Sequence, residues 1–323
     1  PEWRLYARSA GDDKAPIMTI LNAVDALQSS EIGFTSNIKL FFEGEEEAGS
    51  TNLEAHLTKH KALLDDIDIW LFCDGPMHQS RQPQLVFGVR GVTGMEITVY
   101  GATRPLHSGH YGNWAPVPGQ SLAHLIATMK DENGQVLIDG FYDTVVPLSE
   151  FERFELSKIP DVDRQLKKEL GLAYTEGNGR SINERLLLPS LTIKGLSSGN
   201  VGKKARNVIP NTATAAIGVR LVKGNDPEDM LDKVEAHIRS QGFHIVNDEP
   251  DMATRRKYPK IAKVDRRGSG YIASRTSMEE PNAKAIIKAV RAFVGDKLIL
   301  MPALGGSLPL YLFTDFLKKP AII

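Results

Sequence analysis

The chain has 323 residues, of which 41% are apolar and 24% are charged, a composition typical of a folded globular protein of two domains. The 39 basic residues nearly balance the 40 acidic ones, and no segment has the basic excess of a nucleic-acid-binding protein. No apolar run approaches the roughly 20 residues that span a bilayer. We therefore expect neither a nucleic acid nor a membrane as a partner. The single cysteine, Cys73, excludes an internal disulfide.

The first 88 residues predict alternating helices and strands. Apolar residues recur at helical spacing from Ile17 to Leu27, and the apolar runs 38–42 and 67–73 predict buried strands. Between these strands, Ser50 is placed to cap a helix that runs to Leu64. Apolar strands that alternate with helices predict a sheet covered on both faces.

From about Val89 the pattern becomes that of a smaller α+β domain whose sheet has one open face. Asp226-Pro227 begins a helix that Gly242 ends. The other predicted elements are a helix over 121–130 and strands over 95–100, 212–222 and 243–246. The charged segment 141–188 has no clear assignment.

After Met278 the first pattern returns. Helices begin at Pro281 and Pro309, a strand covers 298–301, and the last residues begin another buried strand. The sequence thus predicts an α/β domain with helices on both faces of a mixed sheet, interrupted by an α+β domain. We assign residues 1–88 and 273–323 to the first domain and residues 89–272 to the second.

Three acidic motifs each follow a predicted strand or begin a helix: Asp12-Asp13-Lys14, the run from Glu43 to Ser50, and Asp74-Gly75-Pro76. Ligands bind at the carboxyl ends of parallel strands, and carboxylates that converge there repel one another unless a cation holds them. Singly, each motif is weak evidence for a metal site: a glutamate run is more often a solvated first helical turn, Asp-Asp-Lys is a common helix start, and Asp-Gly-Pro is typical of a tight turn. Their joint order favours a metal site, and Zn²⁺ suits a site of carboxylate and histidine ligands.

Two polar loops could bind a substrate. His107-Ser108-Gly109 begins a loop rich in glycine and aromatic residues, although a lone loop histidine is usually only solvated. Gly305-Gly306-Ser307 lies between a predicted strand and a helix, where its N–H groups could bind an anion.

These segments together resemble, in order and over essentially the whole chain, the co-catalytic di-zinc aminoacylase/carboxypeptidase G family of metallopeptidases. The resemblance is to the branch that contains carnosine dipeptidases and relatives of succinyl-diaminopimelate desuccinylase. The run from Glu43 to Ser50 fits the specific family pattern Glu-Gly-any-Glu-Glu-any-Gly-Ser. The resemblance implies a phosphorylase/hydrolase-like α/β catalytic domain interrupted by an α+β lid, which also forms the interface of a homodimer.

The resemblance also implies roles for the acidic residues. Asp12 bridges two divalent metal ions, and a cis peptide joins it to Asp13. Glu47 and Asp74 each bind one ion, and Glu46 is the general base. Zn²⁺ is the expected metal, with Mn²⁺ and Co²⁺ as alternatives. Glu46 then takes a proton from the metal-activated water and delivers it to the leaving amine.

In the lid, His107 matches a histidine that reaches into the partner's active site to stabilise the oxyanion. Asn207 and Arg220 match residues that contact the backbone and the terminal carboxylate of the substrate, and an arginine fork binds both oxygens of a carboxylate. Gly306 and Ser307 match positions beside the substrate.

The chain departs from the family pattern at several points. Ala7-Arg8-Ser9 replaces the usual Gly-Arg-Gly, Ala15 replaces a glycine, and Leu304 stands where many relatives carry an acid. The family's His-X-Asp motif and its final zinc-binding histidine are expected before Pro1 and after Ile323. We therefore expect the 323-residue chain to bind metal weakly or not at all and to be inactive by itself.

The resemblance implies a zinc-dependent exopeptidase that hydrolyses dipeptides or short peptides with a free C-terminal carboxylate. An N-acyl amino acid deacylase or related amidohydrolase of the same family is one alternative. A catalytically inactive relative that serves as a binding protein is another. A cytoplasmic location is expected.

Overall fold

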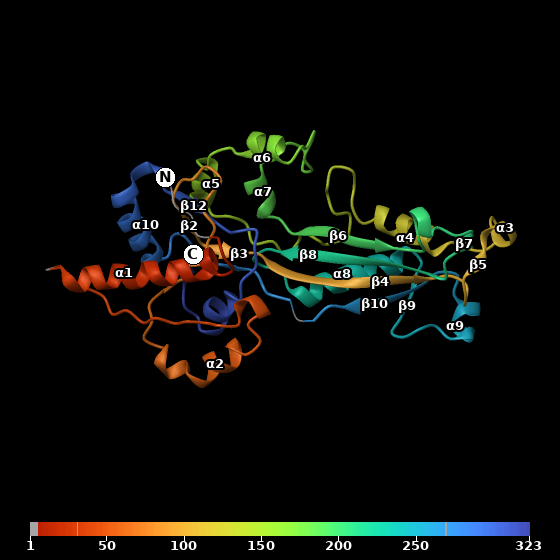
Figure 1. Cartoon of the computed structure of the whole chain (residues 1–323), viewed down its shortest axis with the longest axis horizontal. Coiled ribbons are helices and arrows are strands. Elements are labelled where there is room, and N and C mark those ends of the chain that lie inside the picture. Colours follow the sequence, from red (N-terminus) through yellow and green to blue (C-terminus); the bar gives the residue numbers. More distant parts are fainter. Residues whose placement is uncertain (1–5, 31, 269) are drawn as a thin grey trace. The chain divides into compact units, whose positions relative to one another are not determined.

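A computed structural model describes residues 6–30, 32–268 and 270–323. The chain forms two compact units (Figure 1). The first unit contains residues 1–88, 276–301 and 312–323, and the second contains residues 89–275 and 302–311. The division predicted from the sequence placed residues 302–311 in the catalytic domain, whereas these residues pack with the second unit.

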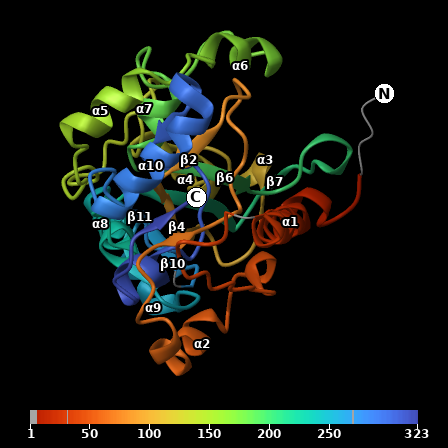
Figure 2. The ribbon, with the colours of Figure 1, turned by 90° about the vertical axis from the view of Figure 1, so that its left-hand side faces the viewer.

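The first unit contains a small mixed sheet. Strand β1 (Trp70–Leu71) pairs in parallel with β13 (Ala321–Ile322), and β2 (Gln84–Val86) pairs in parallel with β12 (Ile299–Met301). Val86 and Ile323 exchange two backbone hydrogen bonds of 2.8 Å, an antiparallel contact that joins the two pairs. The helices of this unit are α1 (Ala15–Ser29), α2 (Leu53–Lys59) and α10 (Pro281–Val294). Figures 1 and 2 show α2 and α10 on opposite sides of the C-terminal strand.

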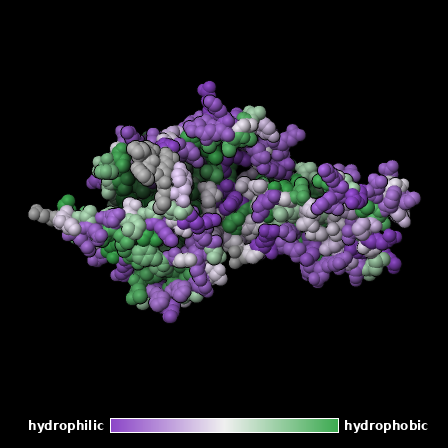
Figure 3. Space-filling view, in the orientation of Figure 1, coloured by the Kyte–Doolittle hydropathy of each residue, from purple (hydrophilic) through white to green (hydrophobic). Residues whose placement is uncertain are grey.

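The buried strand predicted over residues 38–42 does not form. This segment is extended, but Ile38 is 52% exposed and Phe42 is 59% exposed. A strand needs a neighbouring backbone to complete its hydrogen bonds, and no described segment pairs with this one. Figure 3 shows apolar side chains on the surface of this part of the first unit.

Three further predictions in the first unit need correction. The strand predicted over 67–73 is only β1, because only two residues find a partner. Ser50 does not cap α2, because it has a φ of 51° and donates to Glu43, and Asn52 takes the N-cap position. The helix predicted from Pro309 is a single π-turn, Leu312–Phe316, which is followed by Lys318 with a positive φ and by Pro320. The first unit also has single turns of helix at Ala10–Lys14, Glu46–Ala48, Lys61–Leu63 and Gly295–Lys297.

The second unit is built on a five-stranded sheet of order β6-β8-β4-β10-β9. These strands are β6 (Ser190–Ser197), β8 (Thr212–Leu221), β4 (Gly91–Tyr100), β10 (Ile261–Arg266) and β9 (His244–Val246). Helices α4 (Pro118–Ala127) and α8 (Pro227–Ser240) contact β4 and supply apolar residues to one core with it. Alternate residues of β4 and β8 enter this core, so the two helices pack against one face of the sheet.

The remaining elements of the second unit are short. Strand β3 (Gly88–Val89) pairs with β11 (Ser274–Arg275), and β5 (Leu106–His107) pairs with β7 (Val208–Ile209). The helices are α3 (Ser108–Tyr111), α5 (Glu150–Ser157), α6 (Asp163–Glu169), α7 (Ile182–Leu186) and α9 (Met252–Lys257), and a 3₁₀ turn covers Gly202–Lys204. In the described part of the chain, none of the helices is long and apolar enough to cross a bilayer.

Candidate active site

The first acidic motif lies in the turn before α1. The peptide bond between Asp12 and Asp13 is cis, as the sequence predicts from the family resemblance. Pro16 lies in the first turn of α1, where its missing N–H leaves no hydrogen bond unmade. Partial burial and the charge of Asp12 raise the pKa of Asp13, and the Oδ1 atom of Asp13 is buried without a hydrogen-bond partner.

The second motif uses its glutamates in two ways. The carboxylate of Glu43 accepts from the Glu45 backbone N–H and the Ser50 hydroxyl, at 3.2 Å each. The carboxylate of Glu45 accepts from the backbone and side-chain nitrogens of Asn52 at 3.0–3.2 Å. The side chains of Glu43 and Glu45 therefore stabilise the conformation of this turn. Glu46 and Glu47 make no side-chain ion pair with any described residue, which leaves their carboxylates free for other chemistry.

The third motif brings its carboxylate to the other two. Asp74 follows β1 closely, and partial burial together with the charges of Asp13, Asp12 and Glu47 raises the pKa of Asp74 to about 6. Partial burial also raises the pKa of Glu46, and the largest charge contribution there comes from Asp74. All three motifs thus meet in the first unit.

This cluster concentrates negative charge in the first unit. It contains five carboxylates, those of Asp12, Asp13, Glu46, Glu47 and Asp74, and lacks any cationic ion-pair partner among the described residues. Such a group is stabilised by a positive charge, and the orphaned Oδ1 of Asp13 lacks a donor. The described side chains do not, however, place three His, Cys, Asp or Glu groups close enough together to hold a metal ion.

His107 and Asn207 lie together in the second unit. Strands β5 and β7 pair His107 with Val208, and the Ser108 N–H donates to the Asn207 carbonyl at 3.0 Å. The Nδ1 atom of His107 accepts from the Gly109 N–H at 3.1 Å, so this hydrogen bond does not use Nε2. Both side chains are exposed in this single chain.

Arg220 and Ser307 form a second polar group in the same unit. The Nη1 atom of Arg220 donates to the Ser307 hydroxyl at 2.7 Å. The adjacent Gly306 carbonyl accepts from the Arg90 N–H at 3.0 Å. The sequence predicts an anion site at a helix N-terminus here, but the next helical turn begins only at Leu312, so the Gly-Gly-Ser segment is a turn without a helix behind it.

The two polar groups lie at opposite ends of β8. Asn207 precedes this strand and Arg220 lies near its end. Because a strand rises about 3.3 Å per residue, the eight steps from Thr212 to Arg220 span roughly 26 Å. A small substrate that contacts Arg220 therefore does not reach His107 of the same chain.

Sequence reasoning missed Arg90. This side chain is only 6% exposed, and its Nη2 atom donates to the Leu188 carbonyl at 2.7 Å and to the Ser190 hydroxyl at 3.0 Å. Burial, followed by the charges of Arg220 and Arg185, lowers the pKa of Arg90 to about 10. A lone arginine inside the apolar run 85–92 was the sequence signal that could have found it.

Comparison with known proteins identifies the second unit. Residues 87–245 match the peptidase dimerisation domain M20_dimer. The second unit is thus similar to the dimerisation domain of the M20 peptidases. The matched range contains Arg90, His107, Asn207 and Arg220, whereas Ser307 lies outside it and packs with the same unit.

Two relatives align with most of the chain. The chain is 28% identical to the Cys-Gly metallodipeptidase dug1 of Schizosaccharomyces pombe, over 99% of the chain and 65% of that protein. It is 28% identical to the human Beta-Ala-His dipeptidase, over 85% of the chain and 55% of that protein. The chain thus spans less than two thirds of the length of both relatives.

The fold is that of the M20 peptidases. The M20 family metallo-carboxypeptidase Sso-CP2 from Sulfolobus solfataricus matches with a TM-score of 0.77 and 28% identity, over 97% of this chain and 68% of that one. The mixed sheet with helices on both sides and the inserted α+β unit are the architecture predicted from the sequence.

Proposed function

We propose that the protein is a metal-dependent exopeptidase that hydrolyses the amide bond of dipeptides or short peptides with a free C-terminal carboxylate. The observation that carries this proposal is the cluster of carboxylates without a cationic partner among the described residues of the first unit. The 28% identity to a metallodipeptidase over 99% of the chain supports it.

The proposed metal ligands are Asp12, Glu47 and Asp74, which would hold two divalent ions. Zn²⁺ is the first candidate, and Mn²⁺ or Co²⁺ are alternatives. When bound, these ions would supply the Lewis acidity that makes a water molecule nucleophilic near neutral pH. Support comes from the donor set, which consists of oxygen atoms with no competing cation among the described residues.

Glu46 is the proposed general base. The turn engages the neighbouring Glu43 and Glu45 in hydrogen bonds and leaves the carboxylate of Glu46 free. This carboxylate accepts a proton from the attacking water and returns it to the nitrogen of the leaving group. A proton relay of this kind contributes about 10²–10⁴-fold to the rate of such reactions.

Arg220 is the proposed ligand of the substrate's terminal carboxylate. Its guanidinium presents a fork of N–H donors that matches two carboxylate oxygens. The Ser307 hydroxyl accepts a hydrogen bond from one of these N–H groups and so orients the guanidinium. Gly306, which has no side chain, leaves open space beside Ser307. This arrangement restricts substrates to peptides with a free C-terminus.

His107 and Asn207 are proposed to act on the substrate of a partner subunit in a homodimer. Their distance from Arg220 along β8 and their exposure in the single chain support this assignment. A match to a peptidase dimerisation domain over residues 87–245 supports the homodimer itself. The predicted cytoplasmic location stays a prediction.

Glu46→Gln in the full-length protein tests the mechanism. Hydrolysis of a panel of dipeptides should fall by about 10²–10⁴-fold in kcat, because the base is lost while size and shape are kept. Glu45→Gln is the matched control, since Glu45 contacts only Asn52 in the turn, and its activity should stay close to that of the wild type. Full activity of Glu46→Gln would contradict the mechanism.

The same panel separates the alternatives. N-acyl amino acids are included beside the dipeptides, because a deacylase of this family would prefer them. A wild-type protein that hydrolyses neither class, even when loaded with Zn²⁺, Mn²⁺ or Co²⁺, would be the catalytically inactive binding relative.

Calorimetric titration of the 323-residue chain with Zn²⁺ tests the expected ligand set. Asp12, Glu47 and Asp74 supply carboxylates alone, and Zn²⁺ sites normally include nitrogen or sulfur ligands. We expect weak binding without a stoichiometric endpoint. Tight binding of two ions per chain would contradict the prediction that further ligands are needed.

A further inference from the structure

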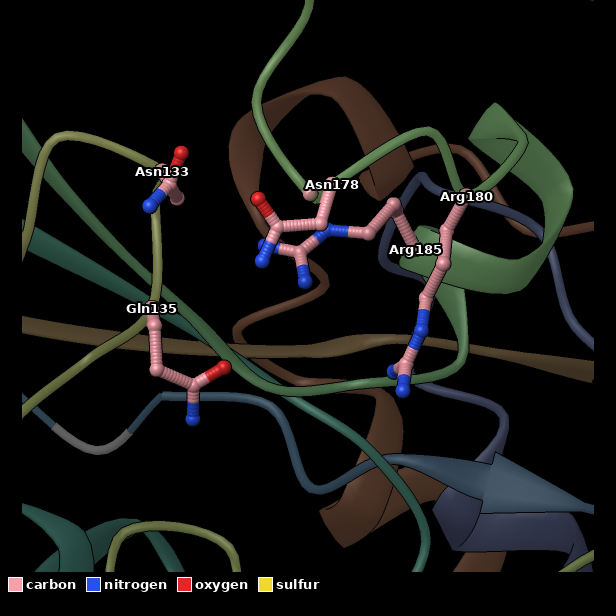
Figure 4. Close-up of a pocket in the computed structure, with 6 residues that line it drawn as sticks. Asn133, Gln135, Asn178, Arg180 and Arg185 are labelled. Atoms are coloured by element: carbon pink, nitrogen blue, oxygen red, sulfur yellow. The ribbon is translucent and has the colours of Figure 1, made fainter.

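A polar pocket in the second unit plays no part in the proposed reaction (Figure 4). Its lining comes from the loop after Lys130, the loop before α7 and α7 itself. The lining residues are Asn133, Gln135, Gly177, Asn178, Arg180 and Arg185. In the view of Figure 4, Asn133 and Gln135 lie on one side, Arg180 lies on the other, and Arg185 lies between them.

Short-range contacts hold the two loops together. The Gly177 N–H donates to the Asn133 carbonyl at 2.8 Å, and Nη2 of Arg185 donates to the Gly134 carbonyl at 3.1 Å. Two glycines make this approach possible: a Cβ on Gly134 would lie 2.6 Å from the Cβ of Glu176, and one on Gly177 would lie 2.6 Å from the Cδ of Arg185. The walls of the pocket are therefore preformed by contacts between the two loops.

Two arginines supply the positive charge of the pocket, and no carboxylate is among its lining residues. Neither Arg180 nor Arg185 forms an ion pair with a carboxylate in the described part of the chain. Of the acidic residues near these loops in the sequence, Glu176 pairs with Lys130 at 2.6 Å. Asp131 accepts from the N–H groups of Asn133 and Gln135, and Glu184 accepts from Ser181, so both keep their negative charge outside the pocket lining.

Hydrogen-bond donors surround this charge. The side-chain amides of Asn133, Gln135 and Asn178 line the pocket beside the two guanidinium groups. Gly177, Asn178 and Gly179 have φ values of 101°, 54° and 80°, a run of left-handed residues that turns the chain tightly around the pocket. The lining thus combines charge with donors and contains no carboxylate among the described residues.

We propose that this pocket binds a small oxyanion of the phosphate type, held by Arg180 and Arg185. Guanidinium groups bind the oxygens of phosphate through paired N–H donors, and the amides of the two loops can complete the shell. The pocket has a volume of about 90 Å³, several times the roughly 10–15 Å³ that one water molecule needs on the same measure, so a small ion has room in it. Arg220 and Ser307 are not among the lining residues, and the proposed site needs neither metal nor peptide.

The test is a calorimetric titration of the full-length protein with inorganic phosphate, at an ionic strength kept constant with NaCl so that screening is matched. Arg180→Gln is the informative variant, because the exposed Arg180 side chain makes no hydrogen bond or ion pair with a described residue, and the backbone N–H that donates to Gly177 is kept. Arg256→Gln removes an equally exposed charge from α9 of the same unit. Arg220→Gln removes the proposed substrate ligand.

We expect saturable binding of phosphate to the wild type, a dissociation constant at least roughly tenfold higher in Arg180→Gln, and little change in the other two variants. Three outcomes would overturn the proposal: no saturable binding to the wild type, unchanged binding in Arg180→Gln, or a loss confined to Arg220→Gln. Equal melting temperatures of the variants without phosphate show that the fold is kept.

Discussion

Arg90 connects the core of the second unit to its proposed substrate ligands. Its backbone N–H donates to the carbonyls of Leu304 and Gly306, and its side chain donates to Leu188 and Ser190. Arg90 therefore binds two segments: its backbone holds the turn that contains Ser307, and its side chain holds the segment that leads into β6. Its Nε atom is buried without a partner among the described residues, and burial and positive neighbours lower its pKa, so this position has an energetic cost.

Arg90→Ala should therefore destabilise the protein by about 2–4 kcal/mol, because it removes two hydrogen bonds of a buried side chain and leaves the partly buried Leu188 carbonyl without this donor. Ser190→Ala removes only one of these partners and should cost about 0.5–1.5 kcal/mol. Urea unfolding at pH 7 measures both. Equal losses in the two variants would show that the Arg90 side chain does not stabilise the chain before β6.

At the residue scale, sequence reasoning named the groups whose chemistry is local. The family pattern over residues 43–50 places Glu45 at a variable position. In the structure the Glu45 carboxylate accepts hydrogen bonds from Asn52. Arg90 was missed because its importance comes from partners about a hundred residues away, at 188 and 190. The roles assigned to Asp12, Glu46, Glu47, Asp74, His107, Asn207, Arg220, Gly306 and Ser307 stay predictions.

At the scale of elements, the central strands β4 and β8 depend on a close backbone approach at Gly94. Gly94 is paired with Gly218, and a Cβ at Gly94 would lie 2.4 Å from the Ile217 carbonyl oxygen. By contrast, a Cβ at Gly195 in β6 would meet only the Cβ of Ala216, at 4.0 Å. The two glycines thus differ in the space around them although both lie in the same sheet.

Gly94→Ala should cost about 1–3 kcal/mol of unfolding free energy, because the backbone of β8 has to shift to admit the methyl group. Gly195→Ala should change the stability by no more than about 0.5 kcal/mol. Thermal or urea unfolding of the two variants gives the comparison. A Gly94→Ala protein as stable as Gly195→Ala would contradict the close approach.

Helices whose capping residues are visible in the sequence could be predicted, whereas strands that depend on a distant pairing partner could not. Asp226 accepts from the Asp229 N–H and begins α8, and Gly242 follows its end with a φ of 84°. Segment 38–42 has the composition of a strand but no partner in the described residues. Segment 141–188 contains two capping boxes that sequence reasoning overlooked, Ser149 with Glu152 and Ser181 with Glu184.

At the scale of the whole molecule, the separation of His107 from Arg220 predicts complementation between two inactive variants. Full-length Glu46→Gln and His107→Ala should each have low activity. Mixed in equal amounts and allowed to exchange subunits, they should regain roughly a quarter of the wild-type activity, because half of the dimers are mixed and one of their two sites is intact.

Activity of the mixture measures this directly, and light scattering checks that the protein is a dimer. A double variant, Glu46→Gln with His107→Ala in one chain, mixed with Glu46→Gln is the control and should stay inactive. No recovery in an exchanged mixture of the single variants would show that His107 does not serve the partner's site.

The pairing of β1 with β13 sets the order in which the chain can fold during synthesis. Trp70 and Leu71 leave the ribosome early, but their partners Ala321 and Ile322 follow only after the entire second unit has been translated. Residues 89–275 are contiguous and contain the whole five-stranded sheet, so the dimerisation unit can fold first. The sheet beside the acidic motifs is then still incomplete, so contacts of the proposed homodimer can form before the proposed catalytic residues have their final neighbours.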